Sequence, residues 1–187
     1  MEEEEGIIPR VIKMIFEEIE KNKERAVFVV KVSFLEIYNE EIHDLLAGNT
    51  MSSDKPVNIR EDKGSVVLMG LHEETVNSME EMFRCLDRGS DHRSTASTLM
   101  NSQSSRSHGI FTINIEQQLL PEVCESEDIQ EFTMAKFHFV DLAGSERAKR
   151  TGASGATLKE GININKGLLC LGNVISCLLY TSDAADE

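Results

Sequence analysis

The chain has 187 residues, a length that suits one domain of ordinary size. Its formal net charge is -14, which argues against nonspecific binding to nucleic acid or to an anionic membrane surface. No apolar run is long enough for a transmembrane helix, and the first residues lack the basic and apolar regions of a secretory signal. The four cysteines and five histidines show neither CxxC nor HExxH spacing. We therefore expect a cytoplasmic protein with reduced thiols, no structural metal site and no membrane partner.

The predicted elements begin with an amphipathic helix over residues 9–21, with Pro9 in its first turn. A β-branched and aromatic run over residues 27–38 predicts a central strand. Residues 40–46 are expected to form a short helical turn. Two short strands, 57–60 and 65–69, then flank the turn residues Asp-Lys-Gly.

The second half of the chain continues the alternation of helices and strands. A capping box, Ser78 with Glu81, predicts a helix that ends at Gly89. Residues 109–117 and 135–140 are expected to pair as a hairpin across an acidic loop, and apolar residues at helical spacing predict a last helix from about residue 161. This order indicates an α/β fold with a sheet covered on both sides.

Two short runs carry the chemistry. The first is Asn-Ser-Gln-Ser-Ser-Arg-Ser-His at residues 101–108, and the second is Asp-Leu-Ala-Gly-Ser-Glu at residues 141–146. Asp141 follows an apolar strand, where a carboxylate can hold hydrated Mg²⁺, and Gly144 lets a backbone N–H approach a phosphate closely. The first run adds hydroxyls for a metal or a water, and an arginine for a charge-assisted hydrogen bond.

These two runs resemble switch I and switch II of the kinesin motor domain. Further similar runs lie at residues 6–10, 34–40 and 163–168, so the likeness covers most of residues 6–176. The sequences of residues 96–103 and 160–165 are most similar to those of the chromokinesin, or kinesin-four, branch. The resemblance implies an incomplete P-loop-type α/β fold with a mixed, mostly parallel central sheet flanked by helices.

The resemblance also implies roles for individual residues in binding ATP and Mg²⁺. Ser105 and Asp141 would hold the metal, Asp141 through its water shell, and Asn101 would support the loop near the phosphates. Ser104 would orient the attacking water, while Gly144 would donate its backbone N–H to the γ-phosphate. Arg106 and Glu146 would form the bridge that closes the two switches. Each of these residues alone also fits an ordinary structural role as a loop serine, a helix cap, a turn or a surface ion pair.

The stretch after the second run is unusually basic for this acidic chain. Its cations are Arg147, Lys149, Arg150, Lys159 and Lys166. In kinesins the matching loop and helix contact tubulin, so the resemblance implies microtubules as the partner and the microtubule cytoskeleton as the location. If the branch assignment holds, the resemblance also implies the nucleus or the spindle as a location. The alternative is a solvated flexible loop, which the neighbouring glycines also fit.

The sequence departs from a complete motor in two places. It contains no G-x-x-x-x-G-K-[ST] loop, which in the family precedes the segment that matches Gly6. Residues 177–187 resemble translated library adaptor rather than motor sequence. We therefore expect residues 1–176 to be a partial motor domain that is inactive by itself, and residues 177–187 to be non-native. We expect the parent, the full-length protein that contains this segment, to be a coiled-coil homodimer.

Two other functions remain open from the sequence. A non-catalytic microtubule-binding kinesin-like module would lack the phosphate loop but would need none of the switch residues. A GTPase would also fit the D-x-x-G pattern at residues 141–144. Its guanine-selecting Asn-Lys-x-Asp has only an imperfect counterpart at residues 165–168, which ends in leucine.

Overall fold

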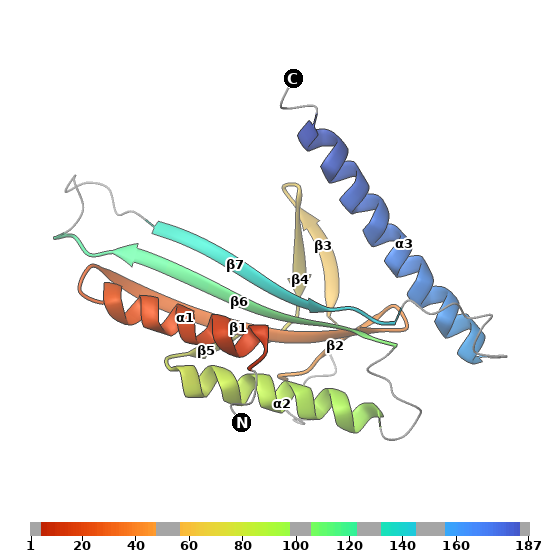
Figure 1. Ribbon diagram of the computed structural model, residues 1–187, viewed down its shortest axis with the longest axis horizontal. Coiled ribbons are helices and arrows are strands. Elements are labelled where there is room, and N and C mark those ends of the chain that lie inside the picture. Colours follow the sequence, from red (N-terminus) through yellow and green to blue (C-terminus); the bar gives the residue numbers. More distant parts are fainter. Residues whose placement is uncertain (1–4, 48–56, 98–105, 123–131, 145–155, 184–187) are drawn as a thin grey trace.

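The computed structural model describes residues 5–47, 57–97, 106–122, 132–144 and 156–183 (Figure 1). The elements in chain order are α1 (Ile7–Asn22), β1 (Ala26–Tyr38), β2 (Glu41–Asp44), β3 (Asn58–Asp62), β4 (Ser65–Met69), β5 (Glu74–Val76), α2 (Met79–Ser97), β6 (His108–Leu119), β7 (Phe132–Asp141) and α3 (Ala156–Asp183). The predicted first helix, central strand, hairpin of short strands and long β6–β7 pair are all confirmed. At the turn between β3 and β4, Lys63 and Gly64 take positive φ angles of 49° and 80°.

The main sheet is built around β1, which pairs with β2, β5 and β6, while β7 pairs with the far edge of β6. Every pairing among the described strands is antiparallel. The expectation of a mostly parallel sheet is therefore wrong for this part of the chain. The alternating helices and strands still give the α/β fold.

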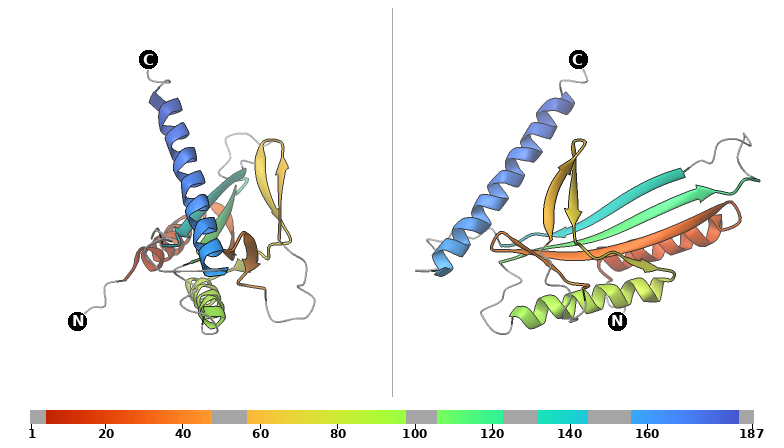
Figure 2. Two further views of the ribbon diagram at one scale, coloured as in Figure 1. Left: turned by 90° about the vertical axis from the view of Figure 1, so that its right-hand side faces the viewer. Right: turned by 180° about the vertical axis from the view of Figure 1, so that it is seen from behind.

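The core lies between one face of the sheet and the helices α1 and α2, which Figures 1 and 2 show beside each other on that face. Val30, Val32 and Phe34 of β1 point into it and meet Ile12 of α1 and Met82 of α2. Phe34 packs edge-on against a phenylalanine of β6, Phe111, with ring centroids 5.5 Å apart. These apolar side chains supply the burial that holds both helices on the sheet.

The opposite face of the sheet is exposed in part, although Ser33 and Leu35 of β1, which lie on that face, are buried at 4% and 3%. Val27, Met134 and Val140 stand on it and are each about half exposed, at 53%, 53% and 52%. The register places these residues on the face away from α1 and α2. Within the described residues, the prediction of a sheet covered on both sides is therefore met only in part.

Residues 41–44 form a strand where a helical turn was expected. Asn39 and Glu40 both adopt positive φ, 50° and 69°, and Tyr38 pairs directly with Glu41. This two-residue connection has the φ signs of a type I′ turn, which turns β1 back on itself as a hairpin. The prediction was wrong because nothing marks Glu40 as a residue that takes the left-handed conformation.

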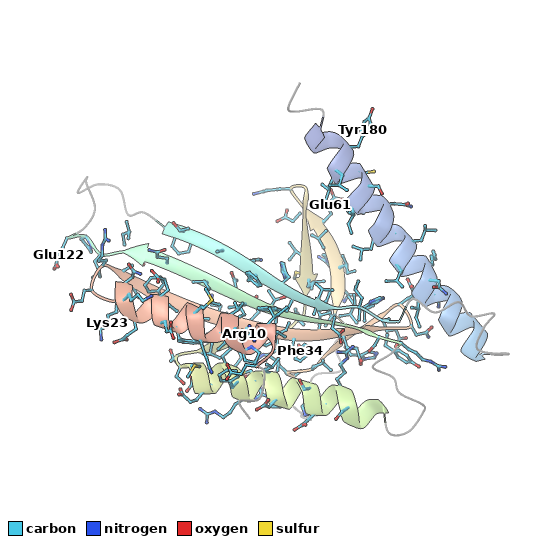
Figure 3. All side chains as sticks on the ribbon, in the orientation of Figure 1. Arg10, Lys23, Phe34, Glu61, Glu122 and Tyr180 are labelled. Carbon is cyan, nitrogen blue, oxygen red and sulfur yellow. The ribbon has the colours of Figure 1, made fainter. Side chains whose placement is uncertain are left out.

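The helix α2 passes through Gly89, the residue predicted to end it, and continues to Ser97. A Cβ atom on Gly89 would lie 2.2 Å from Cδ1 of Phe34. Phe34 lies between the sheet and α2 (Figure 3). Glycine is needed here for close helix–strand contact, and so its position is set by tertiary packing rather than by helix termination.

The helix α3 begins at Ala156, earlier than predicted, and its N-terminal half lies at the end of the main sheet (Figure 1). Asn163 donates a hydrogen bond to the Oδ1 atom of Asn39 in the β1–β2 turn, at 3.2 Å. The same helix continues without a break through residues 177–183, and Tyr180 near its end is 79% exposed (Figure 3). That residues 177–187 are non-native stays a prediction. Among the described helices, none combines the length and apolar character needed to cross a membrane.

Candidate functional site

The candidate site lies at the end of the main sheet where β1 and β7 finish and β6 begins. In the antiparallel register Glu36 pairs with Gly109, and Gly109 pairs with Asp141. Three neighbouring strands therefore bring these residues side by side on the face that α2 covers. Asp141 is the last residue of its strand, as predicted.

Arg93 of α2 connects these strands. Its Nη1 donates to Oδ2 of Asp141 at 2.7 Å, and its Nη2 donates to the backbone carbonyl of Ser107 at 3.1 Å. Its Nε lies 3.5 Å from Oε1 of Glu36. The side chain of Arg93 is only 12% exposed, whereas that of Asp141 is 70% exposed. The guanidinium thus fixes one oxygen of a carboxylate that still faces solvent.

Gly109 has its place because of this arginine. A Cβ atom at residue 109 would lie 2.8 Å from Nη1 of Arg93. The glycine leaves room for the guanidinium to lie across the start of β6 and reach Asp141. A side chain at residue 109 would force the guanidinium of Arg93 to shift from this position.

A buried polar pair anchors the end of the first motif to β1. The hydroxyl of Ser107 donates to Oε1 of Glu36 at 2.5 Å, and the two residues are 0% and 2% exposed. A buried carboxylate requires such partners, because desolvation penalises its charge. Glu36, Ser107 and Arg93 therefore form one charge-compensated cluster beneath Asp141.

His108 holds the segment that follows Asp141. Its ring Nδ1 accepts a hydrogen bond from the backbone N–H of Ala143 at 3.0 Å. Burial lowers the pKa of His108, and the nearby positive charge of Arg93 lowers it further, while Asp141 and Glu40 act in the opposite direction. The neutral ring is thus favoured, and only a ring with Nδ1 unprotonated can accept this bond.

The predicted site residues divide into two groups. Within the described residues, Asp141 and Gly144 lie in the same short segment, held by Arg93 and His108. Arg106 is half-buried and directly precedes Ser107, and Lys166 is exposed on α3. Seven others lie outside the described residues, as does the side chain of Lys159: Asn101, Ser104, Ser105, Glu146, Arg147, Lys149 and Arg150. The Arg106–Glu146 bridge therefore stays a prediction.

The sequence analysis missed Arg93 and Glu36 as parts of this site, and it gave no role to His108, the last residue of the first motif. Arg93 was missed because the helix was predicted to end at Gly89, four residues before Arg93, whereas it continues to Ser97. Glu36 gave a usable signal, since a carboxylate inside an apolar strand needs a cationic or hydrogen-bonding partner. Arg93 is about one turn beyond Gly89 and so lies on the same side of α2.

Comparison with known proteins identifies the family. Residues 1–185 match the kinesin motor domain family. The chain is 53% identical to the mouse chromosome-associated kinesin KIF4 and 53% identical to human KIF4A, over 92% of this chain in both cases. It is 49% identical to the kinesin-like protein KIN-4C of Arabidopsis thaliana, again over 92% of the chain. The predicted likeness to the chromokinesin branch is confirmed.

Solved structures show the same fold. A microtubule-bound KIF14 dimer with AMP-PNP matches with a TM-score of 0.80 and 38% identity, over 98% of this chain and 51% of the KIF14 chain. A fast kinesin matches with a TM-score of 0.72 and 38% identity, over 86% of this chain and 42% of that one. The chain spans only 14% of mouse KIF4 and 13% of human KIF4A.

Proposed function

Because the chain belongs to the kinesin motor-domain family, we propose that it is the switch-bearing part of an ATP-driven microtubule motor. The observation that carries this proposal is the Arg93–Asp141 ion pair at the end of the sheet, beside the His108-held segment that leads to Gly144. A carboxylate fixed by Arg93 and a glycine amide next to the Ala143 peptide that His108 holds, three residues apart, are suited to a metal-bound phosphate. Loss of that phosphate would release both groups together.

The residues present fit Mg²⁺ bound to a nucleotide. Magnesium prefers oxygen ligands and keeps several of its waters. The carboxylate of Asp141 is 70% exposed and is held by Arg93 through one oxygen, so it suits contact with such a water shell. Ser105 would supply the direct hydroxyl ligand. The metal, when bound, would neutralise charge on the phosphates.

The chain's own residues would then position the reacting groups. Gly144 would donate its N–H to the γ-phosphate, and Ser104 would orient the attacking water. Arg106 and Glu146 would pair when the two switches close, and Asn101 would support the first switch. Phosphoryl transfer depends mainly on such positioning and electrostatics, and so a displacement of either switch would stop it.

Microtubules are the proposed partner of the basic stretch after Asp141. The five cations Arg147, Lys149, Arg150, Lys159 and Lys166 contrast with a chain of net charge -14. Lys166 is exposed on α3 and precedes Gly167, where a built Cβ atom would lie 3.8 Å from Nε2 of His108. A helix anchored beside the phosphate-sensing segment is suited to transmit its state to a track. We therefore propose a location on the microtubule cytoskeleton, which by analogy with KIF4 includes the spindle or chromosomes. We also propose that the parent is a coiled-coil homodimer.

The second candidate is a non-catalytic microtubule-binding kinesin-like module. One observation favours it: the 187 residues contain no G-x-x-x-x-G-K-[ST] loop. The intact cluster around Asp141 favours the motor, because a module that only binds tubulin has no need of a held metal-facing carboxylate. Membership of the kinesin family sets the GTPase alternative aside.

The experiment is an ATPase assay with and without microtubules on two proteins. One is the 187-residue chain, and the other is the full motor domain that includes this segment and a phosphate loop. We expect turnover stimulated by microtubules from the full motor and none from the chain alone, because the cradle for the β- and γ-phosphates is missing from the chain. Turnover by the chain alone would contradict the inactive-segment proposal. Microtubule binding without turnover in the full motor would establish the non-catalytic alternative.

A further inference from the structure

The short segment Asp141–Gly144 leaves the sheet in an unusual way. The β6–β7 ladder ends at the pair Gly109 and Asp141. Continued register would place Ala143 opposite Ser107, whose carbonyl is instead bonded to Arg93. The N–H of Ala143 turns to the side chain of His108, at 3.0 Å. The imidazole thus replaces a strand partner at the place where the ladder stops.

This bond fixes the peptide groups next to the phosphate-sensing amide. Ala143 is 5% exposed and directly precedes Gly144. Gly144 has no side chain that could anchor it, and so its orientation depends on its neighbours. Arg93 holds the segment at Asp141, and His108 holds it two residues later. These two side chains come from different elements, α2 and the start of β6.

The opposite side of the imidazole faces the last helix. A Cβ atom built on Gly167 of α3 would lie 3.8 Å from Nε2 of His108, at ordinary van der Waals distance. The ring therefore occupies the space between the segment ending at Gly144 and α3.

We propose that His108 is a positioning residue for phosphate sensing, which orients the Gly144 amide by accepting the Ala143 N–H. The inference rests on the proposed function of Gly144. His108 would make no contact with the nucleotide and would act through the backbone that it holds. Its requirement is a hydrogen-bond acceptor at the Nδ1 position, within reach of the Ala143 N–H.

The variants separate hydrogen bonding from packing. His108→Ala removes both the acceptor and the ring. His108→Asn restores an amide oxygen near the position of Nδ1, whereas His108→Gln reaches toward the position of Nε2 and supplies no acceptor near Ala143. The matched control is His138→Ala on β7, which removes another histidine whose Nδ1 is bonded in the same sheet, to the hydroxyl of Thr112 at 2.9 Å.

The measurement is the affinity of the full motor for AMP-PNP and for ADP, with ATPase turnover of the wild-type motor as reference. We expect His108→Ala to weaken AMP-PNP binding about fivefold, the factor for one hydrogen bond of ordinary net strength, and to leave ADP binding unchanged. His108→Asn should recover most of the AMP-PNP affinity, His108→Gln should not, and His138→Ala should match the wild type. A structural role alone would weaken both nucleotides equally.

Three results would overturn the inference. They are equal loss of ADP and AMP-PNP binding, no loss in His108→Ala, and an Asn variant as impaired as the Ala variant. If the Ala variant does not fold, the tautomer of His108 in the wild-type motor decides, by long-range ¹H–¹⁵N correlation: a proton on Nε2 supports the inference and one on Nδ1 overturns it. A wild-type motor without ATPase activity would instead refute the proposed function, and the inference with it.

Discussion

Replacing Gly89 by alanine should destabilise the protein, although the same change in most helices is stabilising. Alanine in place of glycine in a helix interior gains about 1 kcal/mol. At Gly89, however, the new Cβ would lie 2.2 Å from Cδ1 and 2.9 Å from Cε1 of Phe34. The ring has little freedom to turn away, because it packs edge-on against Phe111.

The expected magnitude follows from these opposing contributions. Overpacking of a well-packed core costs about 1–3 kcal/mol, and contact with a confined ring places Gly89 at the upper end. Subtracting the helix gain of about 1 kcal/mol leaves a net loss of about 2 kcal/mol. Gly172 of α3 is the matched control, because nothing lies within 4 Å of a Cβ built there. Gly172→Ala should stabilise by up to about 1 kcal/mol.

The assay is equilibrium urea unfolding followed by circular dichroism, on the wild type and both glycine variants. Phe34→Leu and the double variant Phe34→Leu with Gly89→Ala complete a cycle, and the smaller side chain should remove most of the Gly89→Ala penalty. The reasoning would be refuted if Gly89→Ala were as stable as the wild type. It would also be refuted if the penalty persisted in the Phe34→Leu background, since the clash with the aromatic ring would then not be its cause.

Three further predictions concern single side chains. Arg93→Ala should lower the free energy of unfolding by about 3 kcal/mol, because it removes the cation that compensates the buried Glu36. The control is Arg84→Ala: the exposed guanidinium of Arg84 lies 3.9 Å from Glu81, and its loss should change the free energy of unfolding by less than about 0.5 kcal/mol. Equal losses for the two variants in urea unfolding would contradict this prediction. Burial raises the pKa of Cys85 to about 11, whereas Cys170 is exposed. Mass spectrometry after iodoacetamide treatment at about pH 8 should therefore find Cys170 alkylated long before Cys85. Similar alkylation rates would contradict this prediction by showing that Cys85 is accessible. The pKa of His108 is lowered in the folded protein, so as the pH falls the unfolded chain takes up its proton first, and the stability from neutral His108 should fall below about pH 6.5. Between about pH 7.5 and 5.5, His108→Asn should therefore lose less stability than the wild type. Identical losses in the two proteins would contradict the assignment.

The parts of the fold that the sequence predicted are those in which local pattern and tertiary structure agree. The apolar face of residues 9–21 and the β-branched run of residues 27–38 became α1 and β1 because burial follows the same periodicity. Asp141 was placed correctly at a strand end because an apolar run stops there. Its motif also named Gly144, which the structure holds beside it.

The parts that were missed depend on contacts between distant residues. Gly89 was taken as a helix end, since nothing local shows that Phe34 occupies the space of its side chain. The strand β2 depends on a positive φ at Glu40, which that residue rarely adopts. Arg93 reaches Asp141, a residue 48 positions further along the chain, and no periodicity reports such a pair.

The central claim is that the Asp141 carboxylate, held by Arg93, serves a motor's nucleotide chemistry. The most direct test is the microtubule-stimulated ATPase rate of the full motor with Asp141→Asn, compared with Asp62→Asn in the β3–β4 hairpin as the matched control. We predict a fall in turnover of at least about 100-fold for Asp141→Asn, the scale of a lost charge-stabilising group in a reaction centre, and no change for Asp62→Asn. Wild-type turnover in Asp141→Asn would contradict the account.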